Sequence, residues 1–280
     1  MKIGAAMFFT DYSMTAVELA KALEERGFDS VWAPEHSHIP VSRKTPFPGG
    51  GDLPKRYYDA MDPFVSLTAA AAVTKNLLVG TGVCLIAQRD AIQTAKQVAS
   101  IDQVSNGRFL FGVGNSWNQD ELENHGTVFA SRHKAARERI EAMKEIWTKS
   151  KAEYHGEFIN FDPMMAWPKP ARKPHPPVIV GGGFPQAARR AVRYGDGWMP
   201  VRRAPGDVEK TMPLYKKMLE EAGRKIEDAP MSIFGARADL DGLKKDRDMG
   251  IVRVVVPLDS DKADKVLPVL DQWAELIRKL

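Results

Sequence analysis

The stretch LLVGTGVCLIAQRDAIQTAKQVASIDQVSNGRFLFGVG, residues 77–114, contains a complete strand–helix–strand unit. The apolar runs at 77–85 and 108–114 have the length of buried strands, and a helix-like segment that ends at glycine lies between them. Gly80 and Gly82 interrupt the first run, which favours a bulge over tight packing alone as their explanation. The stretch therefore predicts two parallel strands joined by a helix.

The same alternation of strand and helix extends from this unit in both directions. Eight apolar runs are each followed by a helix-like segment, at 2–8, 30–36, 77–85, 108–114, 177–183, 197–201, 231–236 and 251–258. Eight such units favour a closed parallel barrel, with an open doubly wound sheet as the alternative. The expected fold class is α/β, a TIM (β/α)8 barrel with insertions.

The barrel is expected to form a single domain over residues 1–280 with two insertions. A loop rich in proline and glycine occupies about 37–61, and a less regular segment occupies about 125–176. Within the second insertion, residues 131–149 have the pattern of an added amphipathic helix. The first insertion is long enough to form part of a substrate pocket, a mobile lid or a dimer contact.

Composition narrows the classes of function. The net charge is +4, and the chain has no block of five or more Lys and Arg, so no nucleic-acid partner is expected. No apolar run approaches the roughly 18 residues of a membrane span, and no signal peptide is recognisable, which predicts a cytoplasmic protein without membrane contact. Cys84 is the only cysteine, so an intrachain disulfide is excluded.

Residues that directly follow the strands of a parallel barrel gather at one rim, where barrel enzymes have their active sites. The second run is followed by Glu35, His36 and His38, the third is followed by Arg89, and the fourth is followed by Asn115 and Ser116. The fifth run is followed by Gly181, Gly182, Gly183 and Phe184, the sixth is followed by Arg202 and Arg203, and the seventh is followed by Arg237. Backbone amides of the glycine run, which precedes a helix, are suited to bind a phosphate. Arginines from several strands suit an acidic ligand.

Other chemistries lack the residues that they need. A zinc site requires three or four converging ligands, and the later strands end without His or Glu, so no metal is expected. Cys84 lies inside an apolar run, no Gly-x-Ser-x-Gly elbow is present, and Asn115 and Arg237 stand where a glycosidase would need carboxylates. An anionic organic cofactor remains, with His36 beside it as a proton or hydrogen-bond partner.

Four stretches carry a resemblance to a known family: GFDSVWAPEHSHIP at 27–40, residues 62–122 from DPFVSLTAAAAVTKN to NSWNQDEL, EYHGEFINFDPMMAWPKP at 153–170, and HPPVIVGGGFPQAARRAVRYGDGWMP at 175–200. In this order they resemble the luciferase-like monooxygenase superfamily, in its branch of coenzyme F420-dependent oxidoreductases. The resemblance implies a homodimeric barrel that binds a flavin or deazaflavin at the carboxyl ends of its strands. It also implies a non-proline cis peptide at Gly82–Val83, behind the cofactor ring.

The resemblance assigns roles to individual residues. Glu35 and His36 match a catalytic Asp-His pair of some members, Asn115 and Ser116 match cofactor contacts, and residues 181–184 match the phosphate-binding turn. Arg89 and Arg202 are expected to hold the anionic cofactor. Trp117 stands where some relatives have a catalytic Glu.

The function implied is hydride transfer between reduced F420 and an unidentified small organic substrate, with His36 steering or protonating that substrate. One alternative is an FMN-dependent luciferase-like monooxygenase. A third possibility, from a different class, is a non-catalytic protein that binds a flavin or deazaflavin.

Overall fold

The computed structural model describes residues 1–202 and 206–280. All eight predicted runs contain a strand, and all neighbouring strands of the central sheet pair in parallel. The strands are β1 (Lys2–Ala6), β2 (Ser30–Ala33), β3 (Leu78–Thr81), β4 (Cys84–Leu85), β5 (Phe109–Gly114), β8 (Val178–Gly181), β9 (Gly197–Met199), β10 (Ser232–Phe234) and β11 (Arg253–Pro257). They are short and buried, as strands covered on both faces should be.

The sheet closes into a barrel. Its strands follow the order β10-β11-β1-β2-β3-β5-β8-β9, and β4 pairs with β5. Parallel bridges from Trp198 to Met231 and from Val201 to Phe234 join the two ends of this order. The barrel prediction is thereby confirmed, and the open sheet is excluded. In this ring β1 and β8 are four places apart, so they lie across the barrel from each other.

The third predicted strand is divided, which confirms the predicted bulge. β3 ends at Thr81 and β4 begins at Cys84, and the peptide bond between Gly82 and Val83 in the gap is cis. The glycines of this run also have a packing role, because a Cβ on Gly80 would lie 2.7 Å from ring atoms of Trp32 inside the barrel. Both explanations of the interrupted run therefore hold, each for a different glycine.

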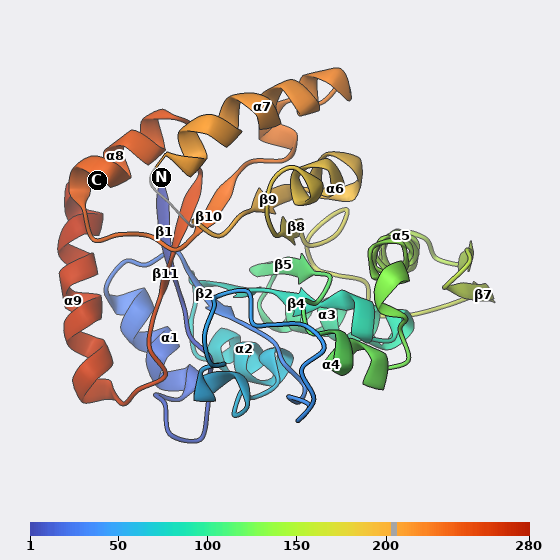
Figure 1. Cartoon of the computed structure of the whole chain (residues 1–280), viewed down its shortest axis with the longest axis horizontal. Coiled ribbons are helices and arrows are strands. Elements are labelled where there is room, and N and C mark those ends of the chain that lie inside the picture. Colours follow the sequence, from blue (N-terminus) through green and yellow to red (C-terminus); the bar gives the residue numbers. More distant parts are fainter. Residues whose placement is uncertain (203–205) are drawn as a thin grey trace.

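Helices surround the barrel (Figure 1). They are α1 (Ala16–Glu25), α2 (Pro63–Ala72), α3 (Ala91–Val104), α4 (Gln119–Asn124), α6 (Gln186–Tyr194), α7 (Asp207–Glu221), α8 (Leu240–Asp248) and α9 (Ala263–Lys279). Asp62 caps the N-terminus of α2, since its carboxylate accepts hydrogen bonds from the amides of Phe64 and Val65 at 2.8 and 3.0 Å. The described part of the chain also contains short 3-10 helices, η1 (Lys55–Tyr57), η2 (Ile86–Gln88), η3 (Phe129–Ser131) and η4 (Ile226–Asp228).

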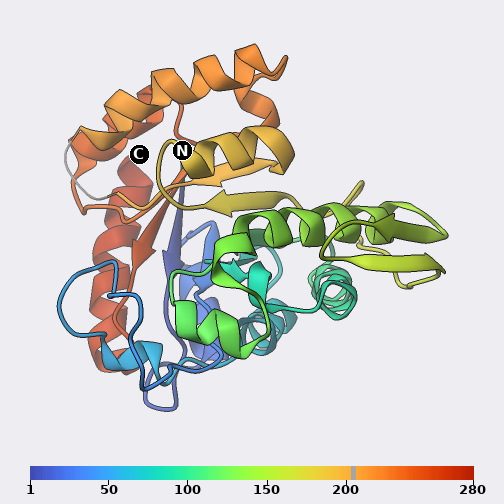
Figure 2. The same ribbon diagram turned by 45° about the vertical axis from the view of Figure 1, so that its right-hand side comes forward.

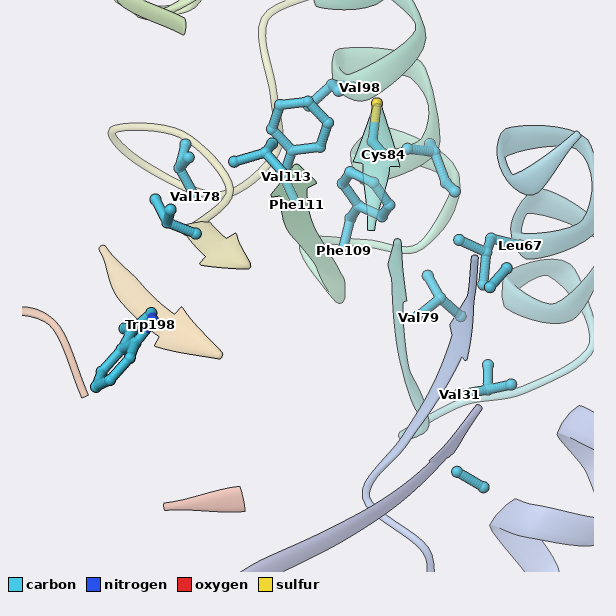
Figure 3. Close-up of a cluster of buried hydrophobic side chains, with 14 of the residues drawn as sticks. Val31, Leu67, Val79, Cys84, Val98, Phe109, Phe111, Val113, Val178 and Trp198 are labelled. Atoms are coloured by element: carbon cyan, nitrogen blue, oxygen red, sulfur yellow. The ribbon is translucent and has the colours of Figure 1, made fainter. Parts of the chain in front are cut away.

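The main hydrophobic core lies between the strands and this layer of helices. Figure 3 shows Val79, Phe109 and Phe111 from the strands beside Leu67 of α2 and Val98 of α3. A second, smaller cluster fills the barrel itself and includes Trp32, Leu110 and Val255. Outward and inward residues alternate along each strand, which is the packing expected of a filled barrel.

The two predicted insertions differ in structure. Residues 34–54 contain no helix or strand, and η1 follows them before α2. The second segment contains α5 (Arg132–Thr148), as the amphipathic pattern predicts, and an antiparallel hairpin of β6 (Ala152–His155) and β7 (Asn160–Met164). Figure 2 shows that α5 and this hairpin extend together to one side of the barrel.

Candidate active site

A cavity of about 380 Å³ opens among the loops that follow the strands. Eight of the predicted site residues line it: Glu35, His36, Gly82, Val83, Asn115, Ser116, Gly181 and Gly182. Most of its wall is apolar and includes Phe8, Leu85 and Phe234. An apolar cavity with a few convergent polar groups is typical of cofactor and ligand sites.

Val83 forms part of the wall at the bulge, and two glycines leave room for it. A Cβ on Gly114 would lie 2.5 Å from Val83 Cγ2, and a Cβ on Gly181 would lie 2.8 Å from Val83 Cγ1. β5 and β8 therefore end in glycine because the side chain from the bulge occupies the space that a larger residue would need. This arrangement gives the cavity a firm apolar surface beside the two glycines.

His36 is held by a carboxylate from another part of the chain. Its Nδ1 lies 2.7 Å from Oε2 of Glu121 in α4, and both side chains are buried. The other oxygen of Glu121 accepts hydrogen bonds from the Ser37 amide at 3.0 Å and from Gln88 Nε2 at 3.2 Å. Burial opposes ionisation of Glu121, but these hydrogen bonds and the charge of His36 outweigh it and lower the pKa of the carboxyl group.

Glu121 is a site residue that the sequence reasoning missed. It stands three residues after Asn118, whose side chain accepts a hydrogen bond from the Glu121 amide at 3.4 Å and caps α4. The Asn-x-x-Glu spacing is typical of a helix N-terminus. It therefore predicts a capping role for these residues and gives no indication that Glu121 contacts His36.

Glu35 and Arg89 are bound to each other. Glu35 accepts hydrogen bonds from the Leu85 amide and from Arg89 Nε, both at 2.6 Å. Arg89 also bonds Gln97 at 3.1 Å and Asp62 at 3.0 Å, and it lines a separate cavity behind His36. Both oxygens of Glu35 are thus occupied in supporting the bulge, and Arg89 is directed away from the main cavity.

The glycine turn is divided between two cavities. Gly182 has φ +116°, which favours glycine, and it lines the main cavity with Gly181. Gly183, Phe184 and Arg202 line a neighbouring cavity instead. Arg202 forms an ion pair with Asp246 of α8, and Arg203 lies outside the described residues.

A group of basic residues that the sequence did not reveal lies beside Gly182. This cationic corner consists of Arg132 of α5 and Arg190 of α6, together with His133 of α5, whose ring is uncharged near pH 7 because its pKa is about 4. Arg190 and His133 line the cavity, and Arg190 Nη2 would be 3.6 Å from a Cβ on Gly182. Among the described residues neither arginine has a carboxylate within ion-pair distance, and the Nε atoms of both are buried without a hydrogen-bond partner.

The electrostatics of the cationic corner confirm that its charges are not neutralised. Burial, together with repulsion from Arg132 and Arg190, lowers the pKa of His133 to about 4. Burial and repulsion from Arg190 also lower the pKa of Arg132. Like charges gathered without counter-charges are the arrangement that an anionic ligand stabilises. The only sequence signal was the position of Arg190, early in the helix that follows the glycine turn.

Three other basic side chains near the rim are paired with carboxylates. Arg56 lies 3.3 Å from Asp259, Lys55 lies 2.7 Å from Asp59, and Lys44 lies 2.7 Å from Glu123. Arg237 lines a polar cavity beside α8 with Arg202. The free positive charge of the rim is therefore smaller than the sequence indicates, and among the described residues Arg190 is the arginine that lines the main cavity.

Three further observations limit the chemistry. Burial, aided by the nearby Glu35 charge, raises the pKa of the Cys84 thiol well above its usual value, which keeps it a neutral core residue. In residues 1–202 and 206–280, no three His, Cys, Asp or Glu side chains are grouped as metal ligands would be. No helix in the same ranges combines the length and apolar character needed to cross a membrane.

Comparison with known proteins gives consistent matches over most or all of the chain. Residues 11–238 match the family model described as luciferase-like monooxygenase. An uncharacterised protein of Mycobacterium tuberculosis is 36% identical over 98% of both chains. The F420-dependent glucose-6-phosphate dehydrogenase of Amycolatopsis mediterranei is 29% identical over 78% of this chain and 62% of its own.

A solved structure shows the same fold. The F420-dependent secondary alcohol dehydrogenase in complex with an F420-acetone adduct superimposes with a TM-score of 0.78 at 19% identity, covering 99% of this chain and 98% of that one. With the parallel barrel, the bulge and the family match taken together, this chain belongs to the luciferase-like monooxygenase family of oxidoreductases.

Proposed function

We propose that this protein is an F420-dependent oxidoreductase that transfers hydride between the reduced deazaflavin and a small organic substrate. The observation that carries the proposal is a single cavity in which an apolar wall at the bulge, His36 and the cationic corner meet. The similar glucose-6-phosphate dehydrogenase of Amycolatopsis mediterranei is F420-dependent, and this supports F420 as the cofactor.

The residues of the cavity suit a planar, negatively charged cofactor. Val83 and Leu85 present an apolar surface on which a tricyclic ring can lie, and Gly181 and Gly182 permit close approach of the backbone. Arg190, with Arg132 behind it, would hold the phosphate through charge-assisted hydrogen bonds. When bound, the deazaflavin supplies the hydride-transferring carbon, and the protein supplies position and exclusion of water.

His36 has the geometry of a proton-transferring group. Because Nδ1 is bound to Glu121, Nε2 is the ring nitrogen that remains for a substrate in the cavity. A carboxylate on Nδ1 orients the ring and fixes which nitrogen faces the cavity, as it does in other His-carboxylate pairs. Glu35 is then a positioning residue, since it binds Arg89 and the Leu85 amide while His36 faces the cavity.

FMN is the second candidate cofactor, because its phosphate also suits the cationic corner. Calorimetric titration of the purified protein with F420 and with FMN, side by side, distinguishes the two. We expect F420 to bind at least tenfold more tightly than FMN and its reduced form to be oxidised when a substrate is supplied. Tighter binding of FMN, or no binding of F420, would overturn the proposal.

The remaining features of the proposal concern assembly and location. A homodimer and a cytoplasmic location stay predictions from the sequence. Sedimentation of the purified protein tests the first, and fractionation of cells that express it tests the second. The substrate is proposed to be a small molecule.

A further inference from the structure

Five rings from distant parts of the chain form one corner of the cavity. This aromatic corner consists of Phe8, His36, Phe47, Tyr57 and Trp117. His36 lies 5.3 Å from Tyr57 and 5.8 Å from Trp117, measured between ring centroids. Phe47 completes the circuit at 5.2 Å from Tyr57 and 5.8 Å from Trp117, and Phe8 lies 4.5 Å from Tyr57.

Most of the aromatic corner lies away from the cationic corner. Phe8 follows β1 and His36 follows β2, whereas Gly181 ends β8 and Arg190 belongs to the helix after it. Since β1 and β8 are four places apart in a ring of eight, Phe8 lies across the cavity from Arg190, whereas Trp117 follows β5, the neighbour of β8, and closes the aromatic corner on that side. A cofactor whose phosphate occupies the cationic corner would leave the aromatic corner for the substrate.

The first insertion builds part of the aromatic corner and is fastened over it. Phe47 does not line the cavity but packs against Tyr57 and Trp117, which do. The insertion is bonded to α4, since the Lys44 amide donates to Asp120 at 2.8 Å and the Gln119 amide donates to Thr45 at 3.1 Å. Helix α4 also carries Glu121, so one helix supports both the insertion and His36.

No free charge is available to a substrate in the aromatic corner. Glu35 is the only carboxylate on the cavity wall among the described residues, and its two oxygens are occupied. Lys44, Lys55 and Arg56 of the insertion are each paired with a carboxylate. A charged substrate group placed here would lose its hydration without gaining a partner, which is costly. The uncompensated arginines across the cavity additionally disfavour a cation, although aromatic rings alone could bind one.

Hydrogen bonding in this corner is limited to three groups. They are Nε2 of His36, the hydroxyl of Tyr57 and the indole N–H of Trp117, and the last two have no partner among the described residues. A sugar, with a hydroxyl on almost every carbon, would leave most of its polar groups unsatisfied against these rings. A molecule with one polar oxygen on a flat apolar frame would not leave most of its polar groups unsatisfied.

We infer that the aromatic corner binds a planar, uncharged, largely apolar carbonyl compound, such as an aryl or conjugated ketone, with its oxygen directed at His36. The inference rests on the proposed function, because it assigns the cofactor to the other side of the cavity. It specifies the substrate class of the same site and separates it from phosphorylated sugars.

The test compares three naphthalene probes with the same ring and different charge. They are 2-acetylnaphthalene, 2-naphthoate and 2-naphthyltrimethylammonium, with glucose 6-phosphate as a polar reference. Binding to the cofactor-free protein is measured by calorimetry and saturation-transfer NMR. We expect the neutral ketone to bind at least tenfold more tightly than either charged probe. The comparison is repeated in Arg190→Met, whose cationic corner should retain neither the naphthoate nor the sugar phosphate, and there we expect no binding of the sugar phosphate.

Variants locate the site. Trp117→Leu and Phe47→Ala are expected to weaken binding of the ketone at least fivefold, because Trp117 lines the cavity and Phe47 supports the rings of Trp117 and Tyr57. Trp167→Leu is the matched control, since Trp167 is 58% exposed on the connector after β7 and should leave ketone binding unchanged. Equal or tighter binding of a charged probe or the sugar phosphate, or no effect of the aromatic variants, would overturn the inference.

The outcomes also separate this inference from the proposed function. Binding of F420 with no binding of the ketone would contradict the substrate class alone. Binding of the ketone with no binding of F420 would contradict the proposed cofactor and leave the aromatic corner as the ligand site.

Discussion

Nδ1 of His36 and Oε2 of Glu121 lie 2.7 Å apart, although 85 residues separate them in the chain. One follows β2 and the other belongs to α4, so the barrel and the loop after β5 bring them together. Their side chains are 5% and 0% exposed, which places the pair out of competition with water. Most of the predictions below follow from this site and from the charges around it.

Glu121→Gln should impair turnover more than binding. The amide retains the shape of the carboxylate but neither its charge nor its strict preference for accepting a hydrogen from Nδ1, so His36 would adopt mixed tautomers. We expect kcat to fall by ~10–100-fold with little change in the Kd for F420. Kinetics with an accepted ketone and 15N chemical shifts of the His36 ring provide the measurement.

Glu123→Gln on the same helix is the matched control. Glu123 is paired with exposed Lys44 and does not touch His36, so kcat and the ring shifts should remain those of the unchanged protein. Unchanged His36 shifts and unchanged kcat in Glu121→Gln would show that Glu121 has only a structural role.

Arg190→Met should weaken cofactor binding. Its guanidinium lacks a carboxylate partner among the described residues and faces the cavity at Gly182, so a phosphate there would lose a charge-assisted hydrogen bond. We expect the Kd for F420, measured by fluorescence, to rise by ~10–100-fold. Arg189→Met changes the exposed neighbouring residue and should have less than a threefold effect. An equal loss in both variants would indicate general attraction instead of a defined site.

His133 should make the protein less stable in mild acid. Its pKa in the folded protein is about 4, below the usual 6.5, so the unfolded chain binds more protons between these two values. Unfolding free energy must therefore fall as pH decreases from 6.5 to 4. Because the His133 ring is exposed on one side, we expect the fall in unfolding free energy to be smaller than a buried group would give.

His133→Asn should reduce the difference in Tm between pH 7 and pH 4.5. Arg132→Met should reduce it too, since it removes one cation that repels the protonated ring. Thermal unfolding monitored by circular dichroism at both pH values provides the measurement. The same pH dependence in all three proteins would contradict the assignment.

Gly114→Ala should destabilise the barrel at the bulge. The added Cβ would lie 2.5 Å from Val83 Cγ2, so Val83 must move in a region that is already well packed. Overpacking of this kind costs about 1–3 kcal/mol, and cofactor affinity should fall with it. Gly183→Ala is the control, because nothing lies within 4 Å of its Cβ and its stability should change by less than about 0.5 kcal/mol. Equal unfolding midpoints in urea would refute the clash.

Glu24 should stabilise the opposite end of the barrel. Its carboxylate accepts hydrogen bonds from the consecutive amides of Lys75, Asn76 and Leu77 at 2.9, 2.6 and 2.9 Å. Glu24→Ala is expected to lower the unfolding free energy by roughly 1–3 kcal/mol at pH 7 without changing activity. Glu25→Ala, whose side chain is 73% exposed, should have almost no effect.

The contribution of Glu24 should also depend on pH. Burial opposes its ionisation, but the three amides outweigh burial and lower the pKa of the carboxyl group below its usual 4.5. Its stabilisation is therefore complete above that value and is lost as pH falls through the lower folded-state pKa. The gap in Tm between the native protein and Glu24→Ala should shrink at pH 3, and a constant gap would contradict this explanation.

The sequence by itself determined the class of fold, because the features that specify it are local. Runs of buried strand length alternate with amphipathic helices, Asp62 caps α2, and Gly82 marks the bulge; each depends on neighbours within a few residues. It also placed His36, Asn115 and Gly182 at one rim, since every strand end of a parallel barrel lies there.

Only the tertiary structure decided which of those rim residues act together. The pairing of Glu35 with Arg89, the pairing of His36 with Glu121 and the isolation of Arg190 depend on loop paths and on strand order. Side chains that meet across 54 or 85 residues leave no periodic trace in the sequence. Charge behaves in the same way: an arginine contributes to a binding site only if no carboxylate lies beside it, and that is a property of distance in space.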